Sequence, residues 1–271
     1  MSDYTIFFIG FIIIYILVKD TDFINHWKSR SFEDSSPIVI QNLFPTQIKQ
    51  IRTDKDNKII LSDEQIKCCI SELEKKAIKS LKLPNSQIDL RKRLVDKKEY
   101  TPLEIMQKFA NEICAHLFIT ARFTIKIVEK LDEGVAGKYS QGQGSPVIEI
   151  PNPMEYSIEQ IFAILSHEIT HYFLIKKRKI IFKNNQENEI FTEISSVYLG
   201  FGFLILEGYL PRIGFTSKFV TEQSVGYFST DTVKRAILLT AKIRKQNKQE
   251  ILDYFSNDED KKLALIILNS G

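Results

Sequence analysis

Apolar residues recur every three or four positions in three stretches of the chain, at 62–83, 101–117 and 230–245. This spacing places the apolar side chains on one face of an α-helix. The second stretch also begins Thr-Pro-Leu-Glu, with a capping residue at Thr101, proline at the first helical position and an acid behind it. We expect three amphipathic helices that each pack one face on a core, and a short apolar run at 263–268 that docks on the same core.

Two shorter segments, 122–129 and 146–151, instead alternate apolar and polar residues, as half-buried strands do. Residues 131–145 between them are rich in glycine and turn formers. They predict either a hairpin or a loop that crosses the sheet.

Two further segments, 157–179 and 187–209, would have apolar residues on nearly every side if they formed helices. Such a helix is expected at the centre of a domain rather than on its surface. The first of them starts with Ser157 and has Gln160 three residues later, which is the form of a capping box. Both segments are therefore predicted to be buried helices.

The first of these apolar helices contains His167, Glu168 and His171, the pattern His-Glu-x-x-His. Four residues advance a helix by slightly more than one turn, so both imidazoles project from one face and can close on a single Zn²⁺. Glu168 lies on an adjoining face, from which a carboxylate can reach a water on the metal. Buried imidazoles and a carboxylate also need a neutralising partner, and a metal ion supplies one.

A catalytic zinc site needs a third protein ligand and keeps its fourth position for water. The second apolar helix begins acidic, and Glu189 and Glu193 share a face because they are four residues apart. We expect Glu189 to be the third ligand and Glu193 to accept the outer N–H of a ligating histidine. Glu187 is the weaker candidate. Acids are also favoured in the first turn of any helix by the helix dipole alone.

These motifs resemble those of the zincin metallopeptidases, in the branch whose third ligand is a Glu, of which thermolysin is the familiar member. That branch carries Asn-Glu-x-x-Ser-Asp on its second helix, and residues 188–193 look like this pattern with Thr for Ser and Glu for Asp. The order of strand, turn-rich segment, edge strand 146–151 and motif helix is also similar to small bacterial regulatory zincins of the ImmA type. The resemblance covers about residues 122–207. Zincins with three His ligands do not fit, since His26 and His116 both precede the motif.

The resemblance implies a zinc-dependent peptidase that hydrolyses peptide bonds with a zinc-activated water, for which Glu168 is the general base. It also implies that a peptide or protein substrate lies extended along strand 146–151. Zincins usually add a later side chain that stabilises the oxyanion. Four residues are available for this role, and the sequence does not choose among them: Tyr198, Tyr209, Arg212 and Tyr227.

Residues 4–18 form an uncharged apolar run that begins the chain. As a helix it would span about 22 Å, less than the roughly 30 Å of a bilayer's hydrocarbon core, so a membrane anchor and a buried strand or core helix are both open. We expect an anchor, because soluble domains rarely begin this way. Lys19, Lys28 and Arg30 follow the run. By the positive-inside rule they place the rest of the chain in the cytoplasm, and the alternative is a soluble cytoplasmic protein.

Composition sets limits on these interpretations. The chain of 271 residues is 44% hydrophobic and 26% charged, which excludes disorder along its whole length. Its net charge of +3 gives no reason to expect a nucleic-acid partner. The three cysteines, Cys68, Cys69 and Cys114, do not make a disulfide framework, which favours a reducing compartment.

Two other functions compete with the peptidase. One is a non-catalytic zinc-binding or membrane-tethered regulatory protein. Its zinc site would usually be closed by a fourth ligand such as Cys, but no cysteine follows Cys114. The other is nucleic-acid or anionic-membrane binding through the basic runs 176–179 and 91–93. The first run ends the motif helix, where cations offset the helix dipole, so a structural role is favoured there.

The predicted fold is α+β. It is a mostly helical zincin-like domain with a small mixed β-sheet beside the motif helix, preceded by an N-terminal apolar helix. The predicted organisation is an apolar segment at 1–20, a linker or arm at 21–58 and a metallopeptidase domain at 59–271, with its core at 122–207.

Overall fold

The computed structural model describes most of the chain from residue 38 onward. The ranges it describes are 38–40, 51–75, 100–132, 135–142, 144–151, 156–182, 184–210, 212–215, 220–223 and 225–269, with the backbone alone at 38–40, 212–215 and 220–223. The predicted apolar helix at the N-terminus, the basic run 91–93, His26 and the side chain of Arg212 all lie outside this description.

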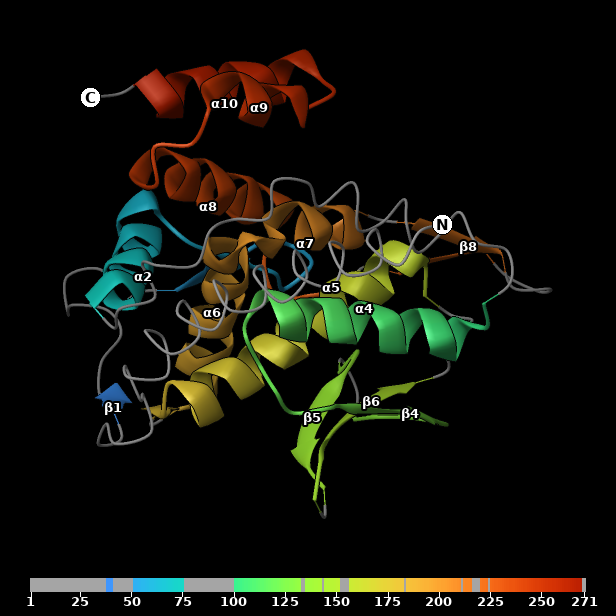
Figure 1. The fold of residues 1–271 in the computed structure, drawn as a ribbon. Helices are drawn as coiled ribbons and strands as arrows, with labels where there is room; N and C mark the ends of the chain where they lie inside the picture. Colours follow the sequence, from blue (N-terminus) through green and yellow to red (C-terminus); the bar gives the residue numbers. More distant parts are fainter. Residues whose placement is uncertain are drawn as a thin grey trace, which may run out of the picture. The chain divides into compact units, whose positions relative to one another are not determined.

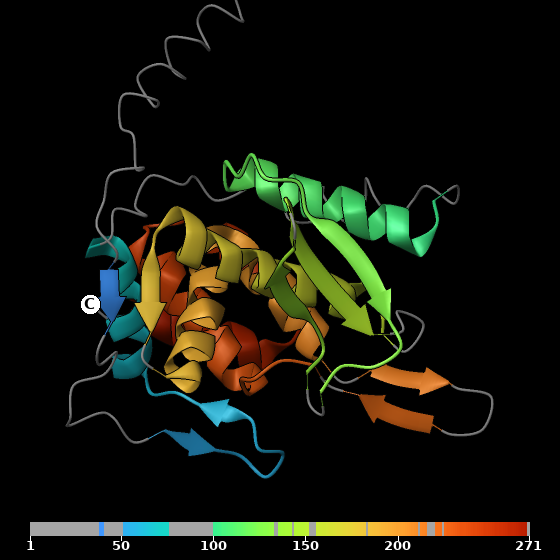
Figure 2. The same cartoon turned by 90° about the horizontal axis from the view of Figure 1, so that it is seen from below.

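A mixed three-stranded sheet stands beside the motif helix (Figure 2). Its strands are β4 (Thr124–Val128), β5 (Lys138–Gln141) and β6 (Pro146–Pro151), in the order β4-β6-β5. β6 pairs parallel with β4 and antiparallel with β5. Residues 131–145 therefore combine the two alternatives: the chain crosses from β4 to β5 on the far side of β6, and β5 then forms a hairpin with β6. The expectation that 146–151 is an edge strand is wrong, because β6 is central and both of its edges are paired.

The motif helix α5 (Ile158–Tyr172) begins where its sequence predicts. The Ser157 side chain accepts the backbone N–H of Gln160, and the Gln160 side chain accepts the backbone N–H of Ser157, so a complete capping box is present. The helix continues as a π-helical segment, η5 (Phe173–Lys177), and then as the short strand β7 (Ile180–Phe182). Every residue from 159 to 171 is buried, so α5 is the central helix.

The second apolar segment is also helical and lies against α5. It consists of α6 (Asn185–Ser196), a π-helical segment η6 (Val197–Phe201) and α7 (Gly202–Tyr209), with a break at Gly200, whose φ is 106°. Among the described residues, Asn185–Tyr209 is the one stretch long and apolar enough to cross a membrane, but 89% of its most apolar window is buried inside the protein. Here it serves as a core helix.

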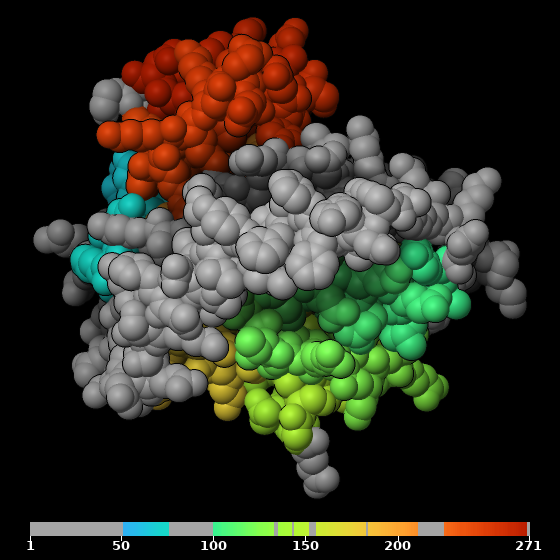
Figure 3. All heavy atoms as spheres, viewed as in Figure 1, coloured from blue at the N-terminus to red at the C-terminus, as the bar shows by residue number. Residues whose placement is uncertain are grey.

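Amphipathic helices enclose this centre (Figure 1). They are α2 (Asp63–Lys75), α4 (Pro102–His116), α8 (Thr230–Ile243), α9 (Lys248–Asp253) and α10 (Asp258–Asn269). α4 runs beside α5 and contacts β4, α2 packs on α6 and α8, and α8 packs on α7. α9 and α10 lie beyond α8, at the far end of the described residues from the sheet (Figure 3).

Three two-stranded pairings complete the structure. β1 (Ile38–Ile40) runs parallel to β7, β8 (Arg212–Phe215) pairs with β9 (Val220–Gln223), and β2 (Arg52–Thr53) pairs with β3 (Ile59–Ile60). Within the β2–β3 hairpin, the backbone N–H of Ile59 donates to the carbonyl of Tyr227 at 2.7 Å, and the Lys58 ammonium donates to the carbonyl of Gly226 at 2.6 Å. Lys58, the last residue of the predicted linker or arm, thus contacts a segment from a distant part of the chain.

The coarse fold prediction is confirmed: the described domain is a mostly helical α+β structure with a small mixed sheet of three strands. The boundaries proposed at residues 20 and 58 remain predictions.

Candidate metal centre

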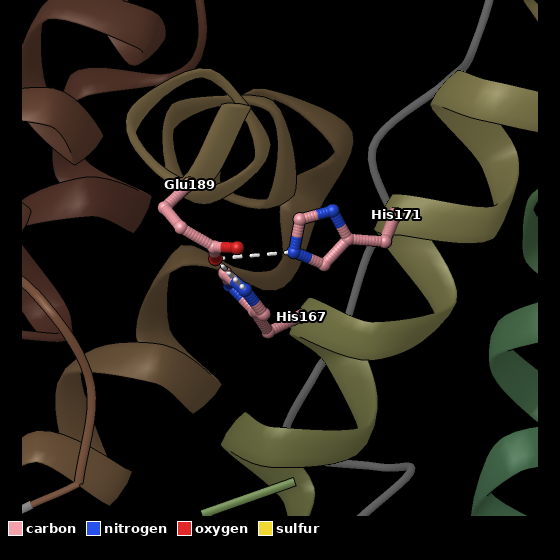
Figure 4. A group of neighbouring side chains, drawn as sticks. All are labelled: His167, His171 and Glu189. Atoms are coloured by element: carbon pink, nitrogen blue, oxygen red, sulfur yellow. Dashed lines mark hydrogen bonds and ion pairs between the residues drawn. The ribbon is translucent and has the colours of Figure 1, made fainter. Parts of the chain in front are cut away.

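His167 and His171 lie one turn apart on α5, and their ring centroids are 4.6 Å apart. Glu189, in the first half of α6, points its carboxylate at both rings (Figure 4). Its Oε2 atom lies 3.0 Å from Nε2 of His167 and 3.1 Å from Nε2 of His171. The structure therefore brings together two imidazole nitrogens and one carboxylate oxygen, all within 4.8 Å of one another.

The two separations from the Glu189 carboxylate fit a shared metal ion such as zinc. Ligand atoms bonded to a tetrahedral zinc at about 2.0–2.1 Å lie about 3.3 Å from each other, and the two nitrogen–oxygen separations of 3.0 and 3.1 Å are close to that value. Both imidazoles are 7% exposed, so the group is shielded but reachable. Among the residues described, no further His, Cys, Asp or Glu belongs to the group, which leaves it with the three protein ligands typical of an open site.

The outer nitrogens of both imidazoles have partners on α6. Nδ1 of His167 lies 2.5 Å from Oε2 of Glu193, and Nδ1 of His171 lies 3.0 Å from the hydroxyl of Thr192. Such outer partners fix the tautomer and the orientation of a ligating histidine. Both rings are thereby arranged with Nδ1 toward α6 and Nε2 toward Glu189.

The charges of this group support one another. Burial opposes protonation of His167, but hydrogen bonds to Glu189 and Glu193, together with the negative charges of Glu193 and Glu168, outweigh burial and raise its pKa well above the ordinary value. For Glu189, burial favours the neutral acid, yet hydrogen bonds from His167 and His171 lower its pKa. At neutral pH Glu189 is therefore ionised, as a metal ligand must be.

Glu168 lies on the side of α5 that faces the sheet. Its Oε2 atom accepts the backbone N–H of Tyr139, on strand β5, at 2.8 Å. The strand can approach this closely because Gly137 precedes it: a β-carbon on Gly137 would lie 2.3 Å from Cγ2 of Ile164 and 3.4 Å from Cγ of Glu168. Glu168 thus connects the edge of the sheet to the metal-binding face of the helix.

A pocket that is partly open to solvent adjoins both Glu168 and His167. Small and apolar residues form much of its lining, and the residues that line it are Ala136, Gly137, Ala163, Ile164, His167, Glu168, Tyr209, Val225, Gly226 and Tyr227. The ring of Tyr227 lies 5.6 Å from that of His167, centroid to centroid. Burial and the negative charges of Glu189, Glu168 and Glu193 raise the pKa of Tyr227, so its phenol keeps its proton at neutral pH.

The structure separates the four residues considered for oxyanion stabilisation. Tyr209 and Tyr227 both line the pocket, but the Tyr209 hydroxyl donates to Glu193. Tyr198 is 1% exposed, with the guanidinium of Arg244 over its ring at 4.2 Å. The Arg212 side chain lies outside the described atoms.

Other candidates are not brought to the metal-binding group. The carboxylate of Glu187 is buried away from it, and one of its oxygens has no hydrogen-bond partner among the described residues. Nε2 of His116 lies 2.9 Å from the carbonyl oxygen of Leu199. Such a contact with the backbone is expected of a packed histidine. In the basic run 176–179, Arg178 is 7% exposed, so the run does not form one exposed cluster.

Three contributors were not predicted. In the sequence, Thr192 stands out only as a departure from a family pattern. Its position next to Glu193, on a helix that faces α5, could have indicated the contact with His171. The contribution of Tyr139 is its backbone N–H, which no side-chain pattern can indicate. Tyr209 was considered for the oxyanion and instead contacts Glu193, a relationship that depends on how α7 packs on α5.

Comparison of the chain with models of protein families, with curated proteins and with solved structures finds no match.

Proposed function

We propose that this protein is a zinc-dependent peptidase of the zincin type. The observation that carries the proposal is the convergence of His167, His171 and Glu189 on one point, with Glu168 beside them at the wall of a solvent-open pocket. A site built only to hold zinc for structure needs neither the pocket nor an adjacent carboxylate, and it is usually closed by a fourth protein ligand.

His167, His171 and Glu189 are proposed to hold the ion. When bound, zinc supplies a Lewis acid that polarises a carbonyl and makes water a better nucleophile at neutral pH. Glu168 is the proposed general base: it takes a proton from the attacking water and delivers it to the leaving amine. The hydrogen bond from Tyr139 holds Oε2 of Glu168, and its other oxygen, Oε1, is proposed to perform the proton transfers.

Among the described strands, β5 has one edge that pairs with no other strand, and this edge replaces β6 as the proposed binding site for a peptide. The N–H of Tyr139 points to Glu168 and hence away from β6. In an antiparallel pair, the N–H and C=O of one residue face the same side of the strand, so the Tyr139 carbonyl also faces the free edge. A peptide would add a strand there through main-chain hydrogen bonds. Its first available partner is the Tyr139 carbonyl, because the N–H is already used.

Tyr227 is proposed to stabilise the oxyanion that forms on the scissile carbonyl. Its ring lies beside His167 at the pocket, and its raised pKa keeps the phenolic proton available for donation. A neutral donor aimed at developing negative charge is the feature that such a role requires.

The test combines metal analysis with peptide hydrolysis by the full chain. The probe is a mixture of random-sequence decapeptides, with products followed by mass spectrometry. We expect about one zinc per chain, hydrolysis that chelator removes and Zn²⁺ restores, and a loss of roughly 10²–10⁴-fold in rate for Glu168→Gln with its zinc retained. The control is Glu112→Gln, at an exposed site on α4, which should match the parent protein.

Each alternative has its own outcome. A parent protein without zinc would overturn the metal centre. Bound zinc with no hydrolysis of any peptide would support the non-catalytic zinc protein instead. Hydrolysis by Glu168→Gln at the parental rate would show that another group is the base.

Membrane association is proposed from the apolar run 4–18, and a cytoplasmic location from the basic residues that follow it, Lys19, Lys28 and Arg30. The full chain should remain with phosphatidylcholine vesicles at high salt, and Ile13→Asp should release it, because a charge in so short an apolar run opposes insertion. Equal recovery of both proteins in the soluble fraction would contradict the anchor.

A further inference from the structure

A buried carboxylate connects the metal-binding group to a tyrosine at the end of α7. Glu193 is fully buried, and each of its oxygens has one partner. Oε2 faces Nδ1 of His167 at 2.5 Å, and Oε1 accepts the hydroxyl of Tyr209. An ionised carboxylate can only accept hydrogen bonds and is costly to bury without donors. The Tyr209 hydroxyl therefore satisfies half of the hydrogen-bonding need of Glu193.

The chain brings Tyr209 to this position by closing α7 tightly on α5. A β-carbon on Gly208 would lie 2.5 Å from Cβ of Ala163 and 2.8 Å from the carbonyl oxygen of Glu159. Glycine at this position lets the two helices approach until the next residue, Tyr209, reaches Glu193. The Tyr209 side chain is 5% exposed, so water does not readily replace its hydroxyl.

The same hydroxyl also contacts the pocket wall. Its oxygen accepts the backbone N–H of Tyr227 at 3.3 Å. Gly226, with φ of 89°, packs directly on the Tyr209 ring, and a β-carbon there would lie 1.7 Å from Cζ. One hydroxyl thus joins two parts of the site that come from distant parts of the sequence, the His167–Glu193 pair and the wall that carries Tyr227.

The donors in this chain of contacts converge on the Glu193 carboxylate from two sides. With Nε2 of His167 toward Glu189, its Nδ1 carries the proton and donates to Glu193. Tyr209 donates to the other oxygen of Glu193 and accepts from the Tyr227 backbone. Removal of the Tyr209 hydroxyl leaves one carboxylate oxygen without a donor, which frees Glu193 to turn away from His167.

We propose that Tyr209 is a positioning residue of the metal centre, which acts through Glu193 to hold His167 in the orientation that binds metal. This inference rests on the proposed function, because it assigns Tyr209 a role toward the ion held by His167. Loss of an outer partner of a histidine ligand typically weakens metal affinity 10–100-fold. Because Tyr209 acts through one intervening carboxylate, we expect the lower end of that range, about tenfold.

The test measures metal binding by the full chain, without any substrate. Zn²⁺ affinity is measured by competition with a chromogenic chelator, and Co²⁺ is added separately to record its visible absorption, which reports the ligand geometry. Tyr209→Phe should bind Zn²⁺ about tenfold more weakly than the parent and shift the cobalt bands. The matched control is Tyr198→Phe, which removes a hydroxyl from another buried tyrosine whose ring lies under Arg244 instead of at the site. It should match the parent in both measurements.

A double-mutant cycle with Glu193→Gln separates positioning from a general loss of stability. If Tyr209 acts through Glu193, then Tyr209→Phe has no further effect on Zn²⁺ affinity once Glu193 is replaced. If Tyr209→Phe binds Zn²⁺ with the affinity of the parent and leaves the cobalt spectrum unchanged, the inference is overturned and the proposed function stays intact. Fully additive effects of Tyr209→Phe and Glu193→Gln on Zn²⁺ affinity would have the same meaning. A parent protein that binds neither Zn²⁺ nor Co²⁺ would overturn both.

Discussion

The hydroxyl of Thr192 lies 3.0 Å from Nδ1 of His171. Its neighbour Glu193 contacts Nδ1 of His167, so two consecutive residues of α6 orient two histidines that are one turn apart on α5. This arrangement explains why both Nε2 atoms face Glu189. It requires α5 and α6 to pack at a fixed distance and rotation, since either helix turned by one residue would lose both contacts.

Thr192→Val should weaken Zn²⁺ binding about tenfold, because valine keeps the shape of threonine but cannot hold the tautomer of His171. The measurement is competition with a chromogenic chelator. Thr240→Val is the matched control: Thr240 is 3% exposed, and its hydroxyl has no hydrogen-bond partner among the described residues. Equal affinities in the two variants would contradict the role of Thr192.

Glu189→Gln and Glu187→Gln test the choice of third ligand. Glu189 is ionised at neutral pH because hydrogen bonds from His167 and His171 outweigh burial and lower its pKa, whereas Glu187 does not belong to the metal-binding group. Replacing a residue that only orients a ligating histidine weakens metal affinity roughly 10–100-fold. Glu189→Gln removes a proposed ligand itself, so it should reduce Zn²⁺ affinity by more than this. Glu187→Gln should leave it unchanged. The reverse result would transfer the ligand role to Glu187.

Tyr227→Phe should lower kcat by roughly 10²–10³-fold, the usual effect of removing one oxyanion donor. KM and zinc content should stay close to those of the parent, because the hydroxyl contributes mainly in the transition state. Steady-state kinetics on one peptide identified from the decapeptide mixture would measure this, with Tyr198→Phe as control. A change confined to KM would assign Tyr227 to substrate binding instead.

Gly226→Ala should destabilise the fold by about 2–4 kcal/mol, since it combines a left-handed backbone with a clash against a buried ring. The φ angle is 89° and the new methyl group would meet Cζ of Tyr209 at 1.7 Å. Gly144→Ala isolates the backbone contribution: φ is 91°, and nothing lies within 4 Å of the added carbon. Its cost should be about 1–2 kcal/mol. Urea unfolding would compare the two, and equal costs would argue against tight packing at Gly226.

His116 should make the fold less stable in mild acid. Burial lowers its pKa below the ordinary 6.5, and the nearby charge of Arg244 acts in the same direction, although the hydrogen bond to the Leu199 carbonyl opposes them. The unfolded chain then binds this proton more readily than the folded one. The resulting contribution to stability is present above about pH 6.5 and is lost as the pH falls through that value toward the folded pKa.

The measurement is the urea midpoint of the parent and of His116→Gln at pH 7.5 and pH 5.5. The variant should lose less stability between the two values than the parent does, because glutamine does not titrate. The difference between the proteins isolates His116 from the other groups that titrate in this range. A parallel fall in both would mean that His116 does not contribute.

Local sequence was sufficient to predict the helices and the histidine pair. The capping box at Ser157 sets the start of α5, and four-residue spacing alone places His167 and His171 on one face. The order of the strands was not predicted, because pairing joins residues far apart in the chain. One signal was nevertheless available: β6 reads PVIEIP, apolar except for Glu149, which is typical of a central strand with both faces covered.

Within the site, predictability falls with sequence distance from the motif. Helical spacing pairs Glu189 with Glu193, but dipole preference alone cannot separate Glu189 from Glu187, since both lie near the start of α6. The contacts of Tyr209 and Tyr227 depend on the packing of α7 and on a turn that glycine makes possible. Those relationships are tertiary, so no local pattern indicates them.

The apolar helical stretch Asn185–Tyr209 has a consequence for an incomplete chain. Its partner α5 precedes it in the chain, whereas its partner α8 follows it. The fit to α8 is close, since a β-carbon on Gly202 would lie 2.7 Å from Cγ1 of Ile237. A chain that ends between residues 209 and 229 therefore leaves the apolar face that packs on α8 uncovered, and exposed apolar surface of this kind favours aggregation.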